Sequence, residues 1–376
     1  MHEAERGLFD LQRGRPLSVT KSADKGASRA VLLATVEGLT PRTLDQLRQL
    51  GPDLLRLAVT GHRALAMGLS GNGHGPGALS LRIDPEASPD DILSMASATD
   101  TRGRWTLDAR AASDPEVGGL TLARLGRLLP AVVSAPIEAS AVLGVRALVE
   151  AGAVLEVTTA QVETMALDDR VEVSHVSDGP VPLSEAENAR FMSFREANGI
   201  LEHVAVLIGN REDWPDPVPV RIHSACLTGD LFGSLRCDCG EQLRMSLRLF
   251  SEAGGGVLIY LAQEGRGIGF GNKLRAYALQ QDGLDTVDAD CTLGFGADER
   301  RYDAAVEMLR HLEVGRIRLL TNNPEKVRAM REGGINVADR QPLYGTLNPH
   351  NFRYVKAKVQ RAGHWLGDML SGVVPD

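Results

Sequence analysis

The sequence predicts an α/β protein built from two domains. Its 376 residues exceed the usual domain length of about 150 residues, so two domains are expected. Short apolar runs typical of strands alternate along the chain with runs whose apolar residues recur at helical spacing. Hydrophobic residues make up 43% and charged residues 24% of the chain. This is a globular composition, which excludes a disordered, collagen-like or heptad-repeat chain.

The first part of the chain shows this alternation clearly. Residues 30–36 form a short apolar run that predicts a strand. Thr40 suits the N-cap of a helix with Pro41 at its first position, and Gly51 is suited to end that helix. Residues 55–60 predict the next strand. The other elements expected here are a Gly- and Pro-rich loop at 71–78 and helices at about 89–98, 119–128 and 139–151.

Turn-forming residues gather near 165–185 and indicate a domain boundary. We therefore expect an α+β domain over residues 1–168 and a second domain over residues 169–376. In the second domain, residues 204–208 predict a strand. Residues 217–222 lead towards Cys226, and their two prolines restrict them to an edge strand or a strand start. The remaining expectations are helices at about 242–253, 273–281, 302–312 and after Asn323, and strands at 257–261 and 317–320.

Composition excludes several functional classes. The net charge is −8 and aromatic residues make up only 4% of the chain, so neither a basic surface nor base-stacking platforms for nucleic acid are expected. No apolar run approaches the roughly 18 residues of a membrane span, and the N-terminus does not resemble a signal peptide. Four cysteines are too few for a disulfide scaffold. We expect reduced cysteines in a cytoplasmic protein without membrane or nucleic-acid partners.

All four cysteines lie after residue 225, and three of them form the spacing C-x10-C-x-C. Cys226, Cys237 and Cys239 could supply three thiolates to a soft divalent metal, with Zn²⁺ favoured. Three protein ligands leave a fourth tetrahedral position for water, which is the arrangement of catalytic zinc. Two alternatives remain open: the cysteines are incidental core residues, or Cys291 adds a fourth thiolate and closes a structural site.

Other polar segments lie close to predicted strand ends. The glycine-rich residues 263–269 follow a predicted strand, and Arg266 within them could bind an anion. Residues 321–326 form a strand-to-helix turn where a phosphate could dock, and residues 298–300 are expected at a helix start. Each segment also has an ordinary explanation, such as capping or complementing the helix dipole. His223, just before the first cysteine, could equally be a core histidine.

Taken together, residues from about 200 to 366 resemble GTP cyclohydrolase II. The blocks that carry the resemblance are 221–230 (RIHSACLTGD), 234–240 (SLRCDCG), 263–269 (QEGRGIG), 272–277, 293–295, 298–300 and 319–324. The resemblance implies a three-layer α/β/α domain with a mixed sheet for residues 169–376, and it implies a homodimer.

The resemblance also implies an activity. Members of this family hydrolyse GTP, open the imidazole ring of guanine, and release formate and pyrophosphate. The product is a diaminopyrimidinone ribosyl phosphate, the first intermediate of riboflavin biosynthesis. By this resemblance Cys226, Cys237 and Cys239 would hold one zinc ion per subunit, which activates the attacking water. Magnesium would accompany the triphosphate.

Site residues follow from the same motifs. Asp298 matches the family's proton acceptor, and Tyr277 matches a tyrosine near the base and zinc. Arg300 matches a proposed nucleophile towards the α-phosphorus, although the high pKa of arginine makes a transition-state stabiliser the sounder physical role. The positions implied to contact GTP are Arg221, His223, Ser224, Gln242, Glu264, Gly265, Arg266, Thr286, Thr321 and Lys326.

Some positions depart from the pattern. Ala225 stands where the family usually has glutamate, and Cys291 is not a family cysteine. Residues 13–19 and 39–44 faintly resemble a dihydroxybutanone phosphate synthase, but the acidic loop that binds its magnesium and substrate is absent from residues 20–26. We therefore expect residues 1–168 to be a non-catalytic relic or extension. Two other functions stay open: a paralogue acting on a related nucleotide, for example in pyrimidine catabolism, or a catalytically silent nucleotide-binding regulator.

Overall fold

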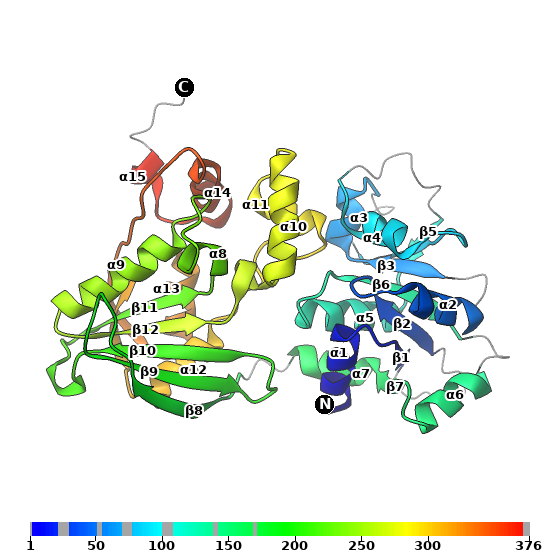
Figure 1. The fold of residues 1–376 in the computed structure, drawn as a ribbon, viewed down its shortest axis with the longest axis horizontal. Coiled ribbons are helices and arrows are strands. Elements are labelled where there is room, and N and C mark those ends of the chain that lie inside the picture. Colours follow the sequence, from blue (N-terminus) through cyan, green and yellow to red (C-terminus); the bar gives the residue numbers. More distant parts are fainter. Residues whose placement is uncertain are drawn as a thin grey trace. The chain divides into compact units, whose positions relative to one another are not determined.

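The computed structural model describes residues 2–21, 30–50, 55–69, 77–99, 108–137, 142–167 and 171–370. The chain forms two compact units: Met1–Asp169 with Gly271–Glu299, and Arg170–Phe270 with Arg300–Asp376. Each unit is built on one seven-stranded sheet (Figure 1). The predicted boundary between residues 168 and 169 lies outside the described residues, so it stays a prediction.

The sheet of the first unit has the strand order β5-β4-β3-β6-β2-β1-β7. Its pairs are antiparallel except for β1 with β7, which run parallel. The strands are β1 (Leu17–Thr20), β2 (Val31–Thr35), β3 (Arg56–Val59), β4 (Leu79–Arg82), β5 (Ala109–Ala111), β6 (Ala131–Pro136) and β7 (Leu155–Thr158). The predicted strands at 30–36 and 55–60 are thereby confirmed as β2 and β3.

Helices α1, α5 and α7 of this unit pack against one another beside the sheet (Figure 1). The helices are α1 (His2–Gln12), α2 (Pro41–Leu50), α3 (Gly61–Ala66), α4 (Pro89–Ser97), α5 (Asp114–Leu125), α6 (Val142–Glu150), α7 (Thr159–Leu167), α10 (Phe270–Gln281) and α11 (Thr286–Thr292). The predicted helices are present with shifted ends. The expected stop at Gly51 and residues 71–76 of the expected loop lie outside the described residues.

The second unit confirms the expected three-layer α/β/α arrangement with a mixed sheet. Its strand order is β14-β13-β11-β12-β10-β9-β8. Strands β11 to β14 run parallel, and β8 to β10 add antiparallel pairs. The strands are β8 (Val173–Pro180), β9 (Ala189–Glu196), β10 (Glu202–Ile208), β11 (Val218–Ser224), β12 (Gly256–Leu261), β13 (Arg316–Leu320) and β14 (Asn336–Gln341).

Apolar residues cover both faces of this sheet. Along β12, Val257 and Ile259 pack with helices α12 and α13, whereas Leu258 packs on the opposite face with Leu247 and Phe250 of α9. Successive strand residues point to opposite faces, so a continuous apolar run marks a strand covered on both sides. The helices of this unit are α8 (Leu227–Asp230), α9 (Cys239–Glu252), α12 (Asp303–His311), α13 (Pro324–Glu332), α14 (Phe352–Ala362) and α15 (Gly367–Leu370).

The strand predicted at 217–222 is central rather than at an edge, because β11 lies between β13 and β12. The alternative of a strand start is the correct one for its prolines. Pro217 precedes β11, and Pro219 is its second residue, which is paired with β13 but lies before the pairing with β12 begins at Val220. The missing backbone donors therefore fall where few ladder hydrogen bonds are lost.

Candidate active site

Three parallel strands end at the same edge of the second sheet and deliver the predicted site residues there. Strand β11 ends at Ser224 and leads into Cys226; β12 ends at Leu261 and leads into residues 263–269; β13 ends at Leu320 and leads into Thr321. The carboxyl ends of parallel strands are where open α/β sheets bind ligands. The topology thus brings together segments that lie up to a hundred residues apart in the sequence.

The cysteine cluster of the predicted metal site is formed. The three Sγ atoms of Cys226, Cys237 and Cys239 all lie within 4.8 Å of one another, and those of Cys226 and Cys237 are 3.6 Å apart. Two sulfurs bound to one tetrahedral zinc at about 2.3 Å lie about 3.8 Å apart, so the thiols are spaced to share one ion. Cys291 lies on α11 of the other unit and is not a member of the group found among the described residues.

The protonation behaviour of the thiols also fits a dication. The hydrogen bond with Cys226 is the main cause that raises the pKa of Cys237 to about 11. The pKa of Cys239 is likewise raised well above its usual value by its hydrogen bonds to Cys226 and Cys237 and by burial. Three adjacent thiolates repel one another, and a divalent cation bound between them removes that repulsion.

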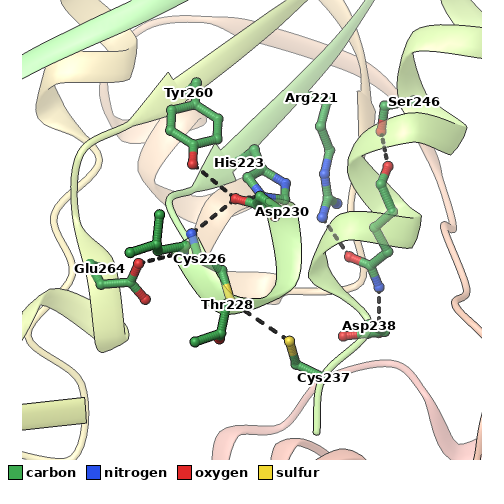
Figure 2. Close-up of polar contacts among 12 residues, drawn as sticks. Arg221, His223, Cys226, Thr228, Asp230, Cys237, Asp238, Ser246, Tyr260 and Glu264 are labelled. Carbon is green, nitrogen blue, oxygen red and sulfur yellow. Dashed lines mark hydrogen bonds and ion pairs between the residues drawn. The ribbon is translucent and has the colours of Figure 1, made fainter. Parts of the chain in front are cut away.

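Asp230 holds the loop that carries the first cysteine (Figure 2). Its carboxylate accepts the backbone N–H of Cys226 at 2.9 Å and the hydroxyl of Tyr260 at 2.9 Å. The Nε2 atom of His223 lies 3.1 Å from the same carboxylate. Gly229, one residue earlier, has no side chain, and an added Cβ would lie only 2.8 Å from the Cys237 Sγ. Each of these features fixes where the thiols sit.

A chain of hydrogen bonds connects the cysteine loop to the predicted nucleotide-contacting residues. Asp238, between the two later cysteines, accepts from Gln242 Nε2 at 2.6 Å. Gln242 Oε1 in turn accepts from Arg221 Nη2 at 2.6 Å. Arg221 also donates to the carbonyl of Leu320 at the end of β13. The predicted contact residues Arg221 and Gln242 are thus oriented by groups next to the cysteine cluster.

Buried positive charge gathers at this edge of the sheet. Lys326 is 6% exposed, and its Nζ donates to the carbonyl of Ile222 at 2.7 Å. Burial, and then the charges of Arg221 and Arg300, lower the pKa of Lys326, and an anion bound beside it would favour the cationic form. Within the described part of the chain, the buried Arg221 Nε and His223 Nδ1 atoms have no hydrogen-bond partner. Buried cations and unused polar atoms suit an anionic, hydrogen-bonding ligand.

The glycine-rich loop is formed after β12, as predicted. Gly265 and Arg266 both adopt left-handed backbone angles, with φ of 62° and 61°. The Glu264 carboxylate accepts the backbone N–H of Leu227 at 2.6 Å, which joins this loop to the cysteine loop. Gln263, which the sequence analysis did not single out, donates to the Ser224 hydroxyl at 3.1 Å and accepts the backbone N–H of Arg301 at 3.1 Å.

The remaining predicted residues lie at the end of β13 and between residues 277 and 300. Thr321 is 1% exposed, and its hydroxyl accepts the backbone N–H of Asn323. Tyr277, Thr286 and Asp298 belong to the segment 271–299, which clusters with the other unit. The expectation that residues 298–300 begin a helix is wrong: α12 begins at Asp303, which supplies the acidic charge of its first turn. Residues 298–300 therefore lie in the preceding loop.

Helix α14, near the end of the chain, contributes residues that the sequence analysis missed. Lys358 Nζ donates to Asp238 Oδ1 at 3.0 Å and lies 4.2 Å from the centroid of the Tyr354 ring. Burial alone would raise the pKa of Asp238, but Lys358 is the main group that holds it below its usual value. Further along, burial and then Lys358, Arg300, Lys326 and Arg266 lower the pKa of His364 to about 3. Aromatic and basic residues at helical spacing in 354–364 could have indicated the helix, but not its contact with the cysteine loop.

On the expectation that the three cysteines bind zinc, Lys358→Met should weaken that binding by about tenfold to a hundredfold, the usual cost of removing a group that orients metal ligands. The methionine keeps the length of the side chain but cannot hold Asp238 between the two cysteines. Affinity is measured by competition of the purified protein with a chromophoric chelator. Lys356→Met is the matched control, because Lys356 lies exposed on the same helix. Equal zinc affinity of the two variants would contradict the assigned role.

Comparison with known proteins agrees with this site. Residues 174–342 match the profile of GTP cyclohydrolase II. A GTP cyclohydrolase-2 of Azospirillum brasilense is 42% identical over 97% of this chain and 94% of its own length. One of Acinetobacter baumannii strain SDF is 55% identical over 43% of this chain and 82% of its own length. The riboflavin biosynthesis protein RibBA of Parabacteroides distasonis is 37% identical over 75% of this chain and 70% of its own length.

These matches define the class of the protein as an enzyme of the cyclohydrolase type. The chain belongs to the GTP cyclohydrolase II family. Among solved structures, a two-domain 3,4-dihydroxy-2-butanone 4-phosphate synthase from A. baumannii aligns over 91% of this chain and 99% of its own. It is 15% identical with a TM-score of 0.34, a likeness too low to carry an argument. No described helix is long and apolar enough to cross a membrane.

Proposed function

We propose that this protein hydrolyses GTP, opens the guanine imidazole ring, and releases formate and pyrophosphate as the first step of riboflavin biosynthesis. The observation that carries the proposal is the three-thiol cluster, which lies at the same sheet edge as the buried cations Arg221 and Lys326. Ring opening needs an activated water, and cleavage between the α- and β-phosphates needs neutralisation of phosphate charge. The site holds the residue types for both tasks, and membership of the family supports the same substrate.

Cys226, Cys237 and Cys239 would hold one Zn²⁺ per subunit. Bound there, zinc would supply the Lewis acidity that lowers the pKa of water towards about 7. Hydrogen bonds made by Asp230, Asp238 and Lys358 would hold the cysteine loops in position. Magnesium would accompany the triphosphate of GTP and share the neutralisation of its charge.

The chain's own residues then bind and orient the nucleotide. Arg221, Arg266 and Lys326 face the phosphates as cations, and Arg300 stabilises the charge that develops at the α-phosphorus. Asp298 accepts the proton of the attacking water, and Tyr277 lies near the base. The other proposed GTP contacts are His223, Ser224, Gln242, Glu264, Gly265, Thr286 and Thr321. Because the uncharged rather than the cationic form of His223 is favoured by burial, which lowers its pKa, this residue would hydrogen-bond GTP as a neutral imidazole.

The direct test is formate release from GTP by the purified chain supplied with zinc and magnesium. GTP-dependent formate is the expected result. Turnover of another purine nucleotide without turnover of GTP would favour a paralogue. This alternative stays open because Ala225 stands where the family usually has glutamate. GTP binding without any turnover would favour a silent regulator. We also propose a homodimer, measured by the mass of the protein in solution.

Residues 1–168 are proposed to lack synthase activity, because the acidic loop expected of a dihydroxybutanone phosphate synthase is missing from their sequence. The full chain incubated with ribulose 5-phosphate and magnesium should therefore form no dihydroxybutanone phosphate. Formation of that product would show that the domain has kept a catalytic site by other residues.

A further inference from the structure

In the first unit, residues 1–169 pack against a segment that belongs to the cyclohydrolase part of the sequence. The segment 271–299 lies within the region that matches the family profile, yet it clusters with residues 1–169. It carries three of the proposed site residues: Tyr277, Thr286 and Asp298. The contacts that hold it are made by residues 1–169, so the first unit bears on the geometry of a proposed catalytic segment.

The Thr60 side chain hydrogen-bonds to the turn that follows helix α11. Its hydroxyl donates to the carbonyl of Gly294 at 2.7 Å and accepts the backbone N–H of Arg63 at 3.3 Å, at the start of α3. Gly294 has a φ of +93°, and an added Cβ would lie 2.9 Å from the Thr60 hydroxyl and 3.1 Å from Pro130. Only glycine fits this close approach without strain.

Arg63 binds the end of the same helix. It is 1% exposed, and its Nη1 donates to the carbonyl of Thr292 at 3.0 Å. The rest of the guanidinium donates to the carbonyls of Met95 and Ala98 around the end of α4. Burial lowers the pKa of Arg63 to about 10, so the side chain is still a cation at neutral pH. A cation at the carbonyl ends of helices is favourable.

Both ends of the segment are also attached. At its start, Asn272 donates to the carbonyl of Arg127 at 3.0 Å, and Arg275 pairs with Glu37. At its end, Glu299 lies 4.0 Å from Arg124. The segment is therefore fixed at its beginning, at the turn after α11, and beside Asp298.

We propose that residues 1–169 serve as a scaffold for the cyclohydrolase reaction, with Thr60 and Arg63 as positioning residues for the segment that carries Thr286 and Asp298. The expected effect of this scaffold on catalysis rests on the proposed function. Small displacements of catalytic groups cost large factors in rate. Such a scaffold would give residues 1–169 a part in the reaction without a catalytic loop of their own.

The test compares Arg63→Met with Arg56→Met in the full chain. Arg56 is the matched control: it is also a buried arginine of the first unit, but its hydrogen bonds go to Ser80 and Asp108, not to segment 271–299. We expect Arg63→Met to lower kcat for formate release by about tenfold to a hundredfold, with unchanged zinc content, while Arg56→Met stays within about threefold. Equal losses in both variants, or full activity of Arg63→Met, would overturn the proposal.

A second pair of variants with smaller changes tests the proposal if Arg63→Met does not fold. Thr60→Val removes only the hydroxyl that holds Gly294, and Thr60→Ser restores it. Loss of kcat in Thr60→Val with recovery in Thr60→Ser supports the scaffold, and equal rates in both variants contradict it. Hydrogen exchange of residues 286–299, measured without GTP, should be faster in Thr60→Val than in Thr60→Ser. This readout separates failure of the scaffold from failure of the proposed function.

Discussion

Replacing Cys237 by serine should abolish formate release from GTP and remove the zinc from the purified protein. A hydroxyl is a harder, far less acidic ligand than a thiol, so the site would retain two of its three thiolates. Loss of a ligand should cost more than the roughly hundredfold upper range for groups that only orient ligands. The measurement is zinc content per chain, together with formate formed from GTP.

Cys291→Ser is the matched control for this result. Cys291 lies outside the three-thiol group, so its replacement should leave both zinc content and formate release intact. Cobalt substitution adds a count of ligands, because thiolate-to-cobalt absorption grows with the number of bound sulfurs. Loss of zinc in Cys291→Ser, or a spectrum of four thiolates, would favour the closed structural site.

Gly229→Ala should be almost as damaging, although it adds a single methyl group. That methyl would lie 2.8 Å from the Cys237 Sγ, 3.1 Å from the Cys226 Sγ and 3.1 Å from the Cys239 Cβ. Because all three cysteines crowd around this position, the thiols must separate, and their common distance to one ion is lost. We expect zinc affinity to fall by at least about a hundredfold, measured by chelator competition.

Gly315→Ala tests whether any glycine substitution in this unit would do the same. An added Cβ at Gly315 meets no atom within 4 Å, so its zinc affinity should match that of the unchanged protein. Thermal unfolding of both variants without metal should give similar midpoints if the damage is confined to the metal site. Normal zinc affinity in Gly229→Ala would refute the assigned geometry of the cysteine cluster.

Local spacing was enough to predict the parts of the site that lie on single loops. The cysteine spacing predicted a common site for the three thiols, and the glycines at 265–269 predicted the loop after β12. Asn323 and Pro324 predicted the start of α13 because capping depends on neighbouring residues alone. The central position of β11 was not predicted, since two prolines argue against a central strand until its neighbours are known.

Long-range contacts could not be predicted in this way. Lys358 reaches Asp238 across 120 positions of the sequence, and nothing near either residue indicates the other. The sequence around Arg63 is likewise that of any short helix. Only the fold shows that its guanidinium donates a hydrogen bond to the end of α11. A buried arginine is uncommon enough that sequence patterns do not suggest it.

Product analysis of GTP turnover by the full chain distinguishes opening of the guanine ring from simple phosphate hydrolysis. Formate, pyrophosphate and the diaminopyrimidinone ribosyl phosphate are quantified in the same reaction, with zinc and magnesium present. We expect equal amounts of formate and pyrophosphate from the unchanged protein, and loss of formate in Cys237→Ser. Pyrophosphate release with an intact guanine ring, or no turnover of GTP by the zinc-loaded protein, would contradict the proposed function.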